Sequence, residues 1–208
     1  MAEFPRIEPR LIVFSDTTRA EPELMLARFA ALAERAEPGR VVLTLRDYQL
    51  PIRARYQLAE RLVRIAERSQ QRFGLGERAD LARALGCTAF HLPEAGLGAS
   101  DARSYLGPTV FLSKACHDPE RAPEAELDAL VLSPIFEPRK GRPALGLAAL
   151  ERARSAHREG PALFALGAVD AHNAAACLRA RAAGVALIGA ALAADPEPLL
   201  AALGILRR

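Results

Sequence analysis

The stretch from Ala129 to Leu192 decides the fold of this 208-residue chain. In order, it reads A-L-V-L-S-P-I-F (129–136), a polar loop E-P-R-K-G-R-P (137–143), an amphipathic helix, F-A-L-G-A-V (164–169), a helix opened by Asp170, and V-A-L-I-G-A-A (185–191). Three short apolar strands therefore alternate with helices, and the last two strands end in glycine followed by small residues. In parallel α/β proteins, such strand ends and helix N-termini present backbone N–H groups to anions. The stretch predicts a parallel α/β fold that binds a phosphate-bearing ligand.

Strand-like and helix-like periodicity alternate along the rest of the chain as well. We expect strands over residues 11–15, 41–46, 72–76, 88–92, 109–113, 129–135, 162–167 and 185–189. We expect helices over residues 22–36, 52–70, 79–85, 100–106, 123–128, 147–159, 171–183 and 196–206. Eight strand–helix units of about 26 residues each predict one α/β domain, a single (β/α)8 TIM barrel that spans residues 1–208. A doubly wound open sheet is the alternative, but the segment F-S-D-T-T-R (14–19) after the first strand lacks the glycines of a dinucleotide-binding fingerprint.

Composition narrows the classes of function. Half of the residues are apolar, but no apolar run reaches the roughly 20 residues that cross a bilayer, and the N-terminus carries no export signal. The net charge is only +3, and arginines are interleaved with acids along the predicted helices, which is typical of solvated faces rather than of a nucleic-acid surface. The three cysteines have no metal-binding or redox spacing. We expect a cytoplasmic protein with no membrane or nucleic-acid partner, and a homo-oligomer stays open.

Lysine usage singles out two positions. Only Lys114 and Lys140 are lysines among the 28 cationic residues, and both lie at or just past the C-terminal end of a predicted strand. Barrel active sites lie at these ends, so both lysines are candidate substrate contacts. The alternative is that two lysines have survived by chance in surface loops. Lys140 belongs to a loop over residues 137–146, whose prolines and glycines predict an ordered but movable lid.

The ends of the seventh and eighth predicted strands form the candidate phosphate site. Gly167 and Ala168 precede Asp170, a suitable helix N-cap, and Ile188 and Gly189 end the neighbouring strand. The loops after strands seven and eight are the recurrent phosphate site of TIM barrels. Tight packing of strand against helix is the alternative explanation for these small residues.

Cationic side chains at strand ends could add charge to this site. Four cationic side chains could converge on one anionic group, namely Arg46, Lys114, Arg139 and Lys140. The alternating strand V-V-L-T-L-R (41–46) directs Thr44 and Arg46 to the same face. Pairing of Arg46 with its neighbour Asp47 is the alternative.

Two further groups could supply proton transfer or hold a metal. His117 follows the fifth predicted strand and Glu137 follows the sixth, so either could act as a general acid or base. A capping role in H-D-P-E (117–120) is the alternative for His117. Mg²⁺ requires carboxylates beside phosphate oxygens, and only Glu77 and Glu94 offer them at adjacent strand ends. Mg²⁺ is therefore a possible cofactor, and no other cofactor is indicated.

Seven segments carry a resemblance to a known family. They are L-T-L-R-D-Y (43–48), E-R-A-D-L-A-R-A-L-G-C-T-A-F-H-L (77–92), F-L-S-K-A (111–115), L-S-P-I-F (132–136), L-G-L-A-A-L (145–150), F-A-L-G-A-V (164–169) and G-V-A-L-I-G-A (184–190). From about residue 10 to 203, the chain resembles the thiamine phosphate synthase and TenI family. The resemblance implies a (β/α)8 barrel. The synthases of this family join a pyrimidine pyrophosphate to a thiazole phosphate, with Mg²⁺ holding the pyrophosphate. TenI-type relatives keep the thiazole phosphate pocket, and some are thiazole tautomerases.

The chain keeps one half of the family's site and departs from the other. The kept positions are Arg46, Ser113, Lys140, Gly167, Ala168, Ile188 and Gly189. At the changed positions, this chain has Thr44 where the family has a glutamine, Tyr48 where it has a lysine, and Gly76 and Glu77 where it has Asn-Asp. It has Gly96 in place of an aspartate and residues 137–139 in place of two loop threonines. Ala115 stands at the position of the TenI-type histidine, and His117 lies two residues away. The losses cluster in the half that serves the pyrophosphate and the metal.

We therefore expect a divergent, TenI-like protein of thiamine metabolism that binds a phosphorylated thiazole-type heterocycle and shuffles a proton. In this hypothesis the backbone N–H groups of Gly167, Ala168, Ile188 and Gly189 hold phosphate, Arg46 and Lys140 add charge, and Ser113 orients the substrate. Glu137 or His117, chosen for their positions after predicted strands, moves the proton. Thr44 and Lys114 are further candidate contacts. Two alternatives stay open, an active synthase whose Mg²⁺ is held by Glu77 and the substrate, and a non-catalytic ligand-binding protein.

Overall fold

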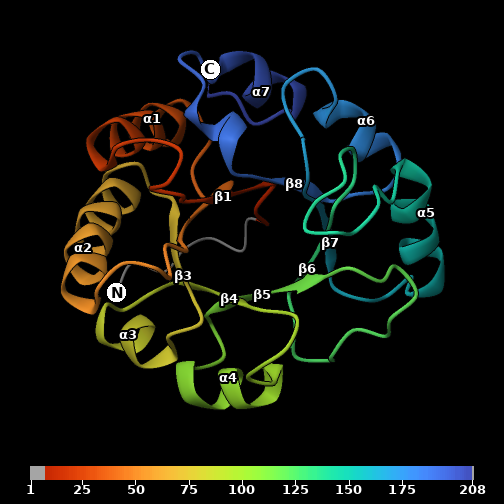
Figure 1. Ribbon diagram of the computed structural model, residues 1–208, viewed down its shortest axis with the longest axis horizontal. Helices are drawn as coiled ribbons and strands as arrows, with labels where there is room; N and C mark the ends of the chain where they lie inside the picture. The colour runs from red at the N-terminus through yellow and green to blue at the C-terminus, as the bar shows by residue number, and fades with distance from the viewer. Residues whose placement is uncertain (1–7, 208) are drawn as a thin grey trace.

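The computed structural model describes residues 8–207, in which eight parallel strands form a closed barrel with helices outside (Figure 1). The strands are β1 (Leu11–Phe14), β2 (Val41–Leu45), β3 (Arg72–Gly76), β4 (Ala89–Leu92), β5 (Phe111–Cys116), β6 (Ala129–Leu132), β7 (Ala162–Ala165) and β8 (Gly184–Leu187). They pair in chain order, and Leu11 closes the barrel by lying opposite both Val41 and Val185. The predicted (β/α)8 TIM barrel is confirmed, while residues 1–7 and 208 of the predicted domain lie outside the described residues.

The α-helices cover the outer face of the barrel, and a short 3-10 helix lies at its mouth. They are α1 (Pro22–Arg35), α2 (Ile52–Arg68), α3 (Ala79–Ala84), α4 (Ala99–Leu106), α5 (Leu147–Ala156), α6 (Ala174–Arg179), α7 (Glu197–Ala202) and the short 3-10 helix η1 (Gly189–Leu192). Pro22 begins α1, where its missing N–H is not needed and its fixed φ suits a helix. In α2, Leu58, Leu62 and Ile65 recur at helical spacing and are buried against the barrel. None of these helices is long and apolar enough to cross a membrane.

The barrel interior is a packed core. Side chains from alternate strand positions fill it, namely Ile12, Phe14, Val42, Ala89, Ala129, Val131, Phe164 and Ala186. The intervening strand residues, such as Leu11, Val13 and Leu43, pack outward against the helices. Burial on both faces explains why the strands read as continuous apolar runs. Because side chains fill the interior, a ligand can bind only at the mouth.

The helix expected over residues 123–128 is wrong, because this segment is a loop. Its polar side chains bind groups on other elements: Glu124 Oε2 accepts the N–H of Ala99 (2.6 Å), and Asp128 Oδ2 accepts the N–H of Leu112 (2.7 Å). The strand before it, β5, runs to Cys116 instead of ending at Ser113.

Helices α6 and α7 are the most shortened relative to expectation, and α2 and α5 also end early, at Arg68 and Ala156. Before α6, residues 171–173 form a turn, because Asp170 Oδ1 accepts the N–H groups of His172 (2.8 Å) and Asn173 (3.2 Å). Helix α7 ends at Ala202, and Gly204 follows at a φ of 65°. A glycine in this conformation is a common helix terminator.

Candidate active site

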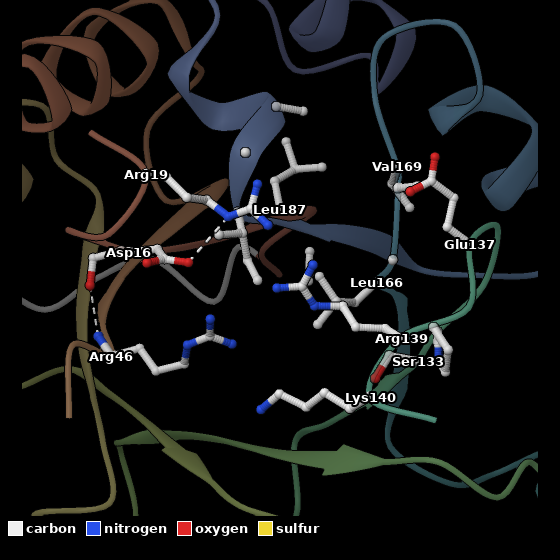
Figure 2. Close-up of a pocket in the computed structure, with 18 of the residues that line it drawn as sticks. Asp16, Arg19, Arg46, Ser133, Glu137, Arg139, Lys140, Leu166, Val169 and Leu187 are labelled. Atoms are coloured by element: carbon white, nitrogen blue, oxygen red, sulfur yellow. Dashed lines mark hydrogen bonds and ion pairs between the residues drawn. The ribbon is translucent and has the colours of Figure 1, made fainter. Parts of the chain in front are cut away.

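A cavity of about 660 Å³ opens at the C-terminal mouth of the barrel (Figure 2). Its walls come from the segments that follow β1, β2, β5, β6, β7 and β8. Five cations line it, Arg19, Arg46, Arg139, Lys140 and Arg142, against four carboxylates, Asp16, Asp47, Glu137 and Asp170. His117 also lines the cavity. The excess of cations suits an anionic ligand.

The wall after β7 and β8 is built from backbone. Gly167 and Ala168 have φ values of 113° and 52°, and Ile188 and Gly189 complete this wall. A Cβ at Gly167 would lie 2.8 Å from the Ile135 nitrogen, so only glycine fits there. No hydrogen-bond acceptor for the N–H groups of Gly167 and Ala168 is found among residues 8–207. These two donors are thus available to a ligand.

The loop between β6 and α5 carries two cations into the cavity. Arg139 and Arg142 exchange both backbone hydrogen bonds at 3.0 Å. Figure 2 shows Arg139 and Lys140 directed toward the centre of the cavity, while Glu137 lies at the rim near Val169. The predicted lid is therefore an ordered hairpin in this state, and Glu137 is turned away from the cations.

Arg46 approaches the cavity from the end of β2. Its guanidinium carbon lies 5.6 Å from the Phe14 ring centroid, and its backbone N–H donates to Ser15 Oγ at 2.8 Å. Asp47 does not pair with it. Instead, Asp47 Oδ1 accepts the Thr17 N–H (2.6 Å) and the Thr17 hydroxyl (2.8 Å). The Arg46 side chain is left facing the ligand space.

His117 is held by Glu94, a carboxylate that the sequence indicates only as a candidate metal ligand. Glu94 Oε2 lies 2.7 Å from His117 Nδ1, and Glu94 Oε1 accepts the His117 backbone N–H at 3.0 Å. Burial raises the pKa of Glu94, but the hydrogen bonds from His117 and the positive charge of Arg142 outweigh burial and leave this pKa below its usual range. An ionised carboxylate only accepts hydrogen bonds, so Nδ1 carries a proton and Nε2 is free to act on a ligand.

Four predicted contacts do not line the cavity. Thr44 and Ser113 face the packed interior and are almost fully buried, and Ser113 Oγ lies 2.9 Å from His91 Nδ1. Lys114 points the other way and forms an ion pair with Glu124 beneath α4. The reason is strand geometry, since an inward Ser113 forces its neighbour Lys114 outward. The fourth, Glu77, is exposed beyond the end of β3.

Where the family resemblance implies a metal-binding half, Tyr48 packs closely against Gly76. A Cβ at Gly76 would lie 2.6 Å from the Tyr48 hydroxyl oxygen, and Arg55 lies over the Tyr48 ring at 5.2 Å. Burial of the hydroxyl, followed by the charge of Glu77, raises the pKa of Tyr48 to about 12. Across residues 8–207, no group of three or more His, Cys, Asp or Glu side chains converges on a point. With Glu94 bound to His117, the donor set does not fit a metal held by the protein.

Arg19 and Arg142 line the cavity although no sequence motif assigns them a role, whereas Glu94 is indicated only as a candidate metal ligand. Arg19 follows β1 and bonds through Nε to Asp16 Oδ2 at 3.2 Å. The signal was present, because Asp16 follows a strand end and Arg19 stands three residues later. Arg142, on the β6–α5 loop, was also unassigned and lies 3.8 Å from Glu94 Oε2.

Comparison with known proteins identifies the family. A sequence model of the family described as "Thiamine monophosphate synthase" (TMP-TENI) matches residues 17–191. A thiamine-phosphate synthase of Thermus thermophilus is 37% identical over 177 residues, covering 82% of this chain and 84% of the relative. A putative thiamine-phosphate synthase of Geobacter sulfurreducens is 33% identical over 174 residues, covering 81% of each.

Other matches are less complete or concern the fold alone. The thiamine-phosphate synthase of Gloeobacter violaceus is 32% identical over 184 residues, and the match spans 86% of this chain but only 52% of that longer relative. In three dimensions, thiamine phosphate pyrophosphorylase from Pyrococcus furiosus aligns with a TM-score of 0.77 at 22% identity, covering 94% of this chain and 95% of that one. The family match extends over most of the chain, and we conclude that the chain belongs to the thiamine monophosphate synthase (TMP-TENI) family.

Proposed function

We propose that the cavity binds a phosphorylated thiazole-type heterocycle and that His117 moves a proton on its ring, as in a TenI-like thiazole tautomerase. The observation that carries the proposal is the asymmetry of the cavity. The backbone at the ends of β7 and β8 lines the cavity together with Arg46 and Lys140, whereas Tyr48 packs onto Gly76 at the end of β3. Family membership supports a role in thiamine biosynthesis.

In this proposal, the phosphate lies at the β7–β8 wall. The N–H groups of Gly167 and Ala168, with the backbone at Ile188 and Gly189, would donate to its oxygens. Lys140 would add a compact positive charge, and Arg46 would face the heterocycle or a second anionic group. Thr44 and Ser113 would support the floor of the site without touching the ligand.

The proton transfer is assigned to His117 rather than to Glu137. Glu94 holds His117 Nδ1, so neutral Nε2 can accept a proton from one ring position and return it to another. The carboxylate would stabilise the imidazolium that forms between the two steps. Since the substrate and the product are isomers, no further reactant is needed. Glu137 lies at the rim and has no such partner among the described residues.

An active synthase is the second candidate, and the 32–37% identity to proteins named thiamine-phosphate synthase favours it. Arg46 and Lys140 could then receive a pyrophosphate, and Mg²⁺ would have to arrive bound to that substrate because the residues described here offer few ligands. A ligand-binding protein without turnover is the third candidate.

For each of these candidate functions, we propose one domain over residues 1–208, located in the cytoplasm, with a small phosphorylated heterocycle as partner.

Two assays on the same preparation test the proposal. The first follows isomerisation of the thiazole carboxylate phosphate, and the second follows thiamine phosphate formation from thiazole phosphate, pyrimidine pyrophosphate and Mg²⁺. We expect isomerisation, and we expect His117→Gln to slow it by about 10²–10⁴-fold, the usual contribution of a general acid–base group. The control is His172→Gln, an exposed histidine, which should not change the rate. Thiamine phosphate formation without isomerisation would refute the proposal and favour the synthase.

A further inference from the structure

Arg19 lies where the β1–α1 loop meets the end of β8. Its side chain lines the cavity and is 40% exposed. A Cβ at Gly189 would lie 3.2 Å from Arg19 Nη1, so the guanidinium is seated directly against the backbone of Gly189. Figure 2 shows Arg19 beside Leu187, on the same side of the cavity as the β8 end. The positively charged guanidinium of Arg19 therefore lies next to the β7–β8 wall, whose backbone N–H groups can donate hydrogen bonds.

The loop that carries Arg19 is fixed by its own hydrogen bonds. Asp16 Oδ1 accepts the N–H (3.1 Å) and the hydroxyl (2.5 Å) of Thr18, and the Asp16 carbonyl accepts the Arg19 N–H at 3.0 Å. Thr17 ties the loop to β2 through Asp47. Burial raises the pKa of Asp16, but the Thr18 hydrogen bonds and the charges of Arg46 and Arg19 outweigh burial and lower it. Asp16 is thus an ionised anchor for Arg19.

This anchor uses only one edge of the guanidinium. Asp16 Oδ2 accepts from Arg19 Nε at 3.2 Å, and within residues 8–207 no hydrogen bond engages Nη1 or Nη2. The free edge is a planar pair of donors with the spacing that matches two phosphate oxygens. Because the anchor has already fixed the side chain, little conformational freedom would be lost when an anion binds.

We propose that Arg19 is a phosphate-binding residue of this chain, which closes the β7–β8 wall with a bidentate guanidinium contact while Asp16 positions it. The contact recognises a phosphate monoester. Its identification as a thiazole phosphate rests on the proposed function, whereas the contact with phosphate itself does not. The role predicts that Gly189 cannot gain a side chain without moving the guanidinium.

The test measures affinity for inorganic phosphate and for thiazole phosphate by titration calorimetry. Arg19→Gln should weaken both by about 10- to 100-fold, the effect of removing charge-assisted hydrogen bonds. The phosphate affinity of Arg19→Lys should lie between those of Arg19→Gln and the wild type, because lysine keeps the positive charge but lacks the paired guanidinium donors. The matched control is Arg61→Gln, since Arg61 is 43% exposed and also pairs with an acid, Glu23, but lies outside the cavity.

A second variant keeps the charge of Arg19 and changes the residue against which its guanidinium packs. Gly189→Ala should shift the guanidinium by a few tenths of an ångström and weaken phosphate binding several-fold. Unchanged phosphate affinity in Arg19→Gln would overturn the proposal, as would absence of phosphate binding in the wild type. Binding of inorganic phosphate that depends on Arg19, without binding of thiazole phosphate, would support the Arg19 contact and refute the proposed function.

Discussion

The buried histidine beneath the cavity makes folding stability depend on pH in a calculable way. His91 lies inside the barrel, with its ring centroid 4.6 Å from that of Phe14 and Nδ1 2.9 Å from Ser113 Oγ. Burial, and then the charge of Arg46, lower the pKa of His91 from 6.5 to about 3. The folded protein therefore keeps this imidazole neutral at pH 5, while the unfolded chain protonates it.

The sign and size of the effect follow from linkage. The unfolded state binds more protons between pH 6.5 and 3, so stability from this group is complete above pH 6.5 and is lost as the pH falls. At pH 5, about 1.5 pH units below the unfolded pKa, the loss is about 2 kcal/mol, at about 1.4 kcal/mol per unit. The assay is urea unfolding at pH 8 and pH 5 for the wild type and for His91→Asn.

The comparison is between slopes rather than absolute stabilities, because His91→Asn also disturbs packing. The wild type should lose about 2 kcal/mol more than His91→Asn between the two pH values. His172→Asn, a change at an exposed histidine, should keep the wild-type slope. Parallel pH dependence in the wild type and His91→Asn would refute the inference that His91 is held neutral in the folded state.

Three substitutions test other parts of the account. Glu94→Gln should lower isomerisation at least 10-fold while thiazole phosphate affinity stays within about twofold, because Nδ1 loses the carboxylate that fixes its proton. Ala168→Gly should raise the unfolding free energy by about 0.5–1 kcal/mol, since Ala168 has a φ of 52°, a left-handed conformation that costs alanine more than glycine. Lys114→Met should leave ligand affinity unchanged and cost about 1–2 kcal/mol of stability, because it breaks the ion pair with Glu124 outside the barrel wall.

Each of these has a contradicting result. Full activity of Glu94→Gln would remove the carboxylate from the proton-transfer step. A lower thermal midpoint for Ala168→Gly would mean that the Ala168 methyl group packs more favourably than its backbone is strained. A large loss of ligand affinity in Lys114→Met would indicate that Lys114 turns into the cavity when ligand binds.

The barrel was predictable because parallel strands buried on both faces appear in sequence as short apolar runs. The limits of β3 were predicted to the residue. The helix over 123–128 was not predictable in the same way, because local pattern cannot reveal that Glu124 and Asp128 bind groups on α4 and β5. These contacts join residues 16 to 25 positions apart in the chain.

In the candidate site, position along strands predicted more than residue type did. Gly167, Ala168 and Gly189 line the cavity because they follow the ends of β7 and β8. The scarcity of lysine makes Lys114 a candidate contact, but Ser113 points inward and strand alternation therefore places the Lys114 side chain outside the barrel. Arg19 was missed because its direction depends on Asp16, a contact within an irregular loop that has no periodicity.

The most direct test of the central claim is isothermal titration of the purified protein with thiazole phosphate, with and without Mg²⁺ and pyrimidine pyrophosphate. We predict binding that needs neither Mg²⁺ nor the pyrimidine, because phosphate is held by the β7–β8 backbone and by cations of the protein. Binding only in the presence of Mg²⁺ and pyrimidine pyrophosphate, with thiamine phosphate formed in the calorimeter cell, would contradict this claim.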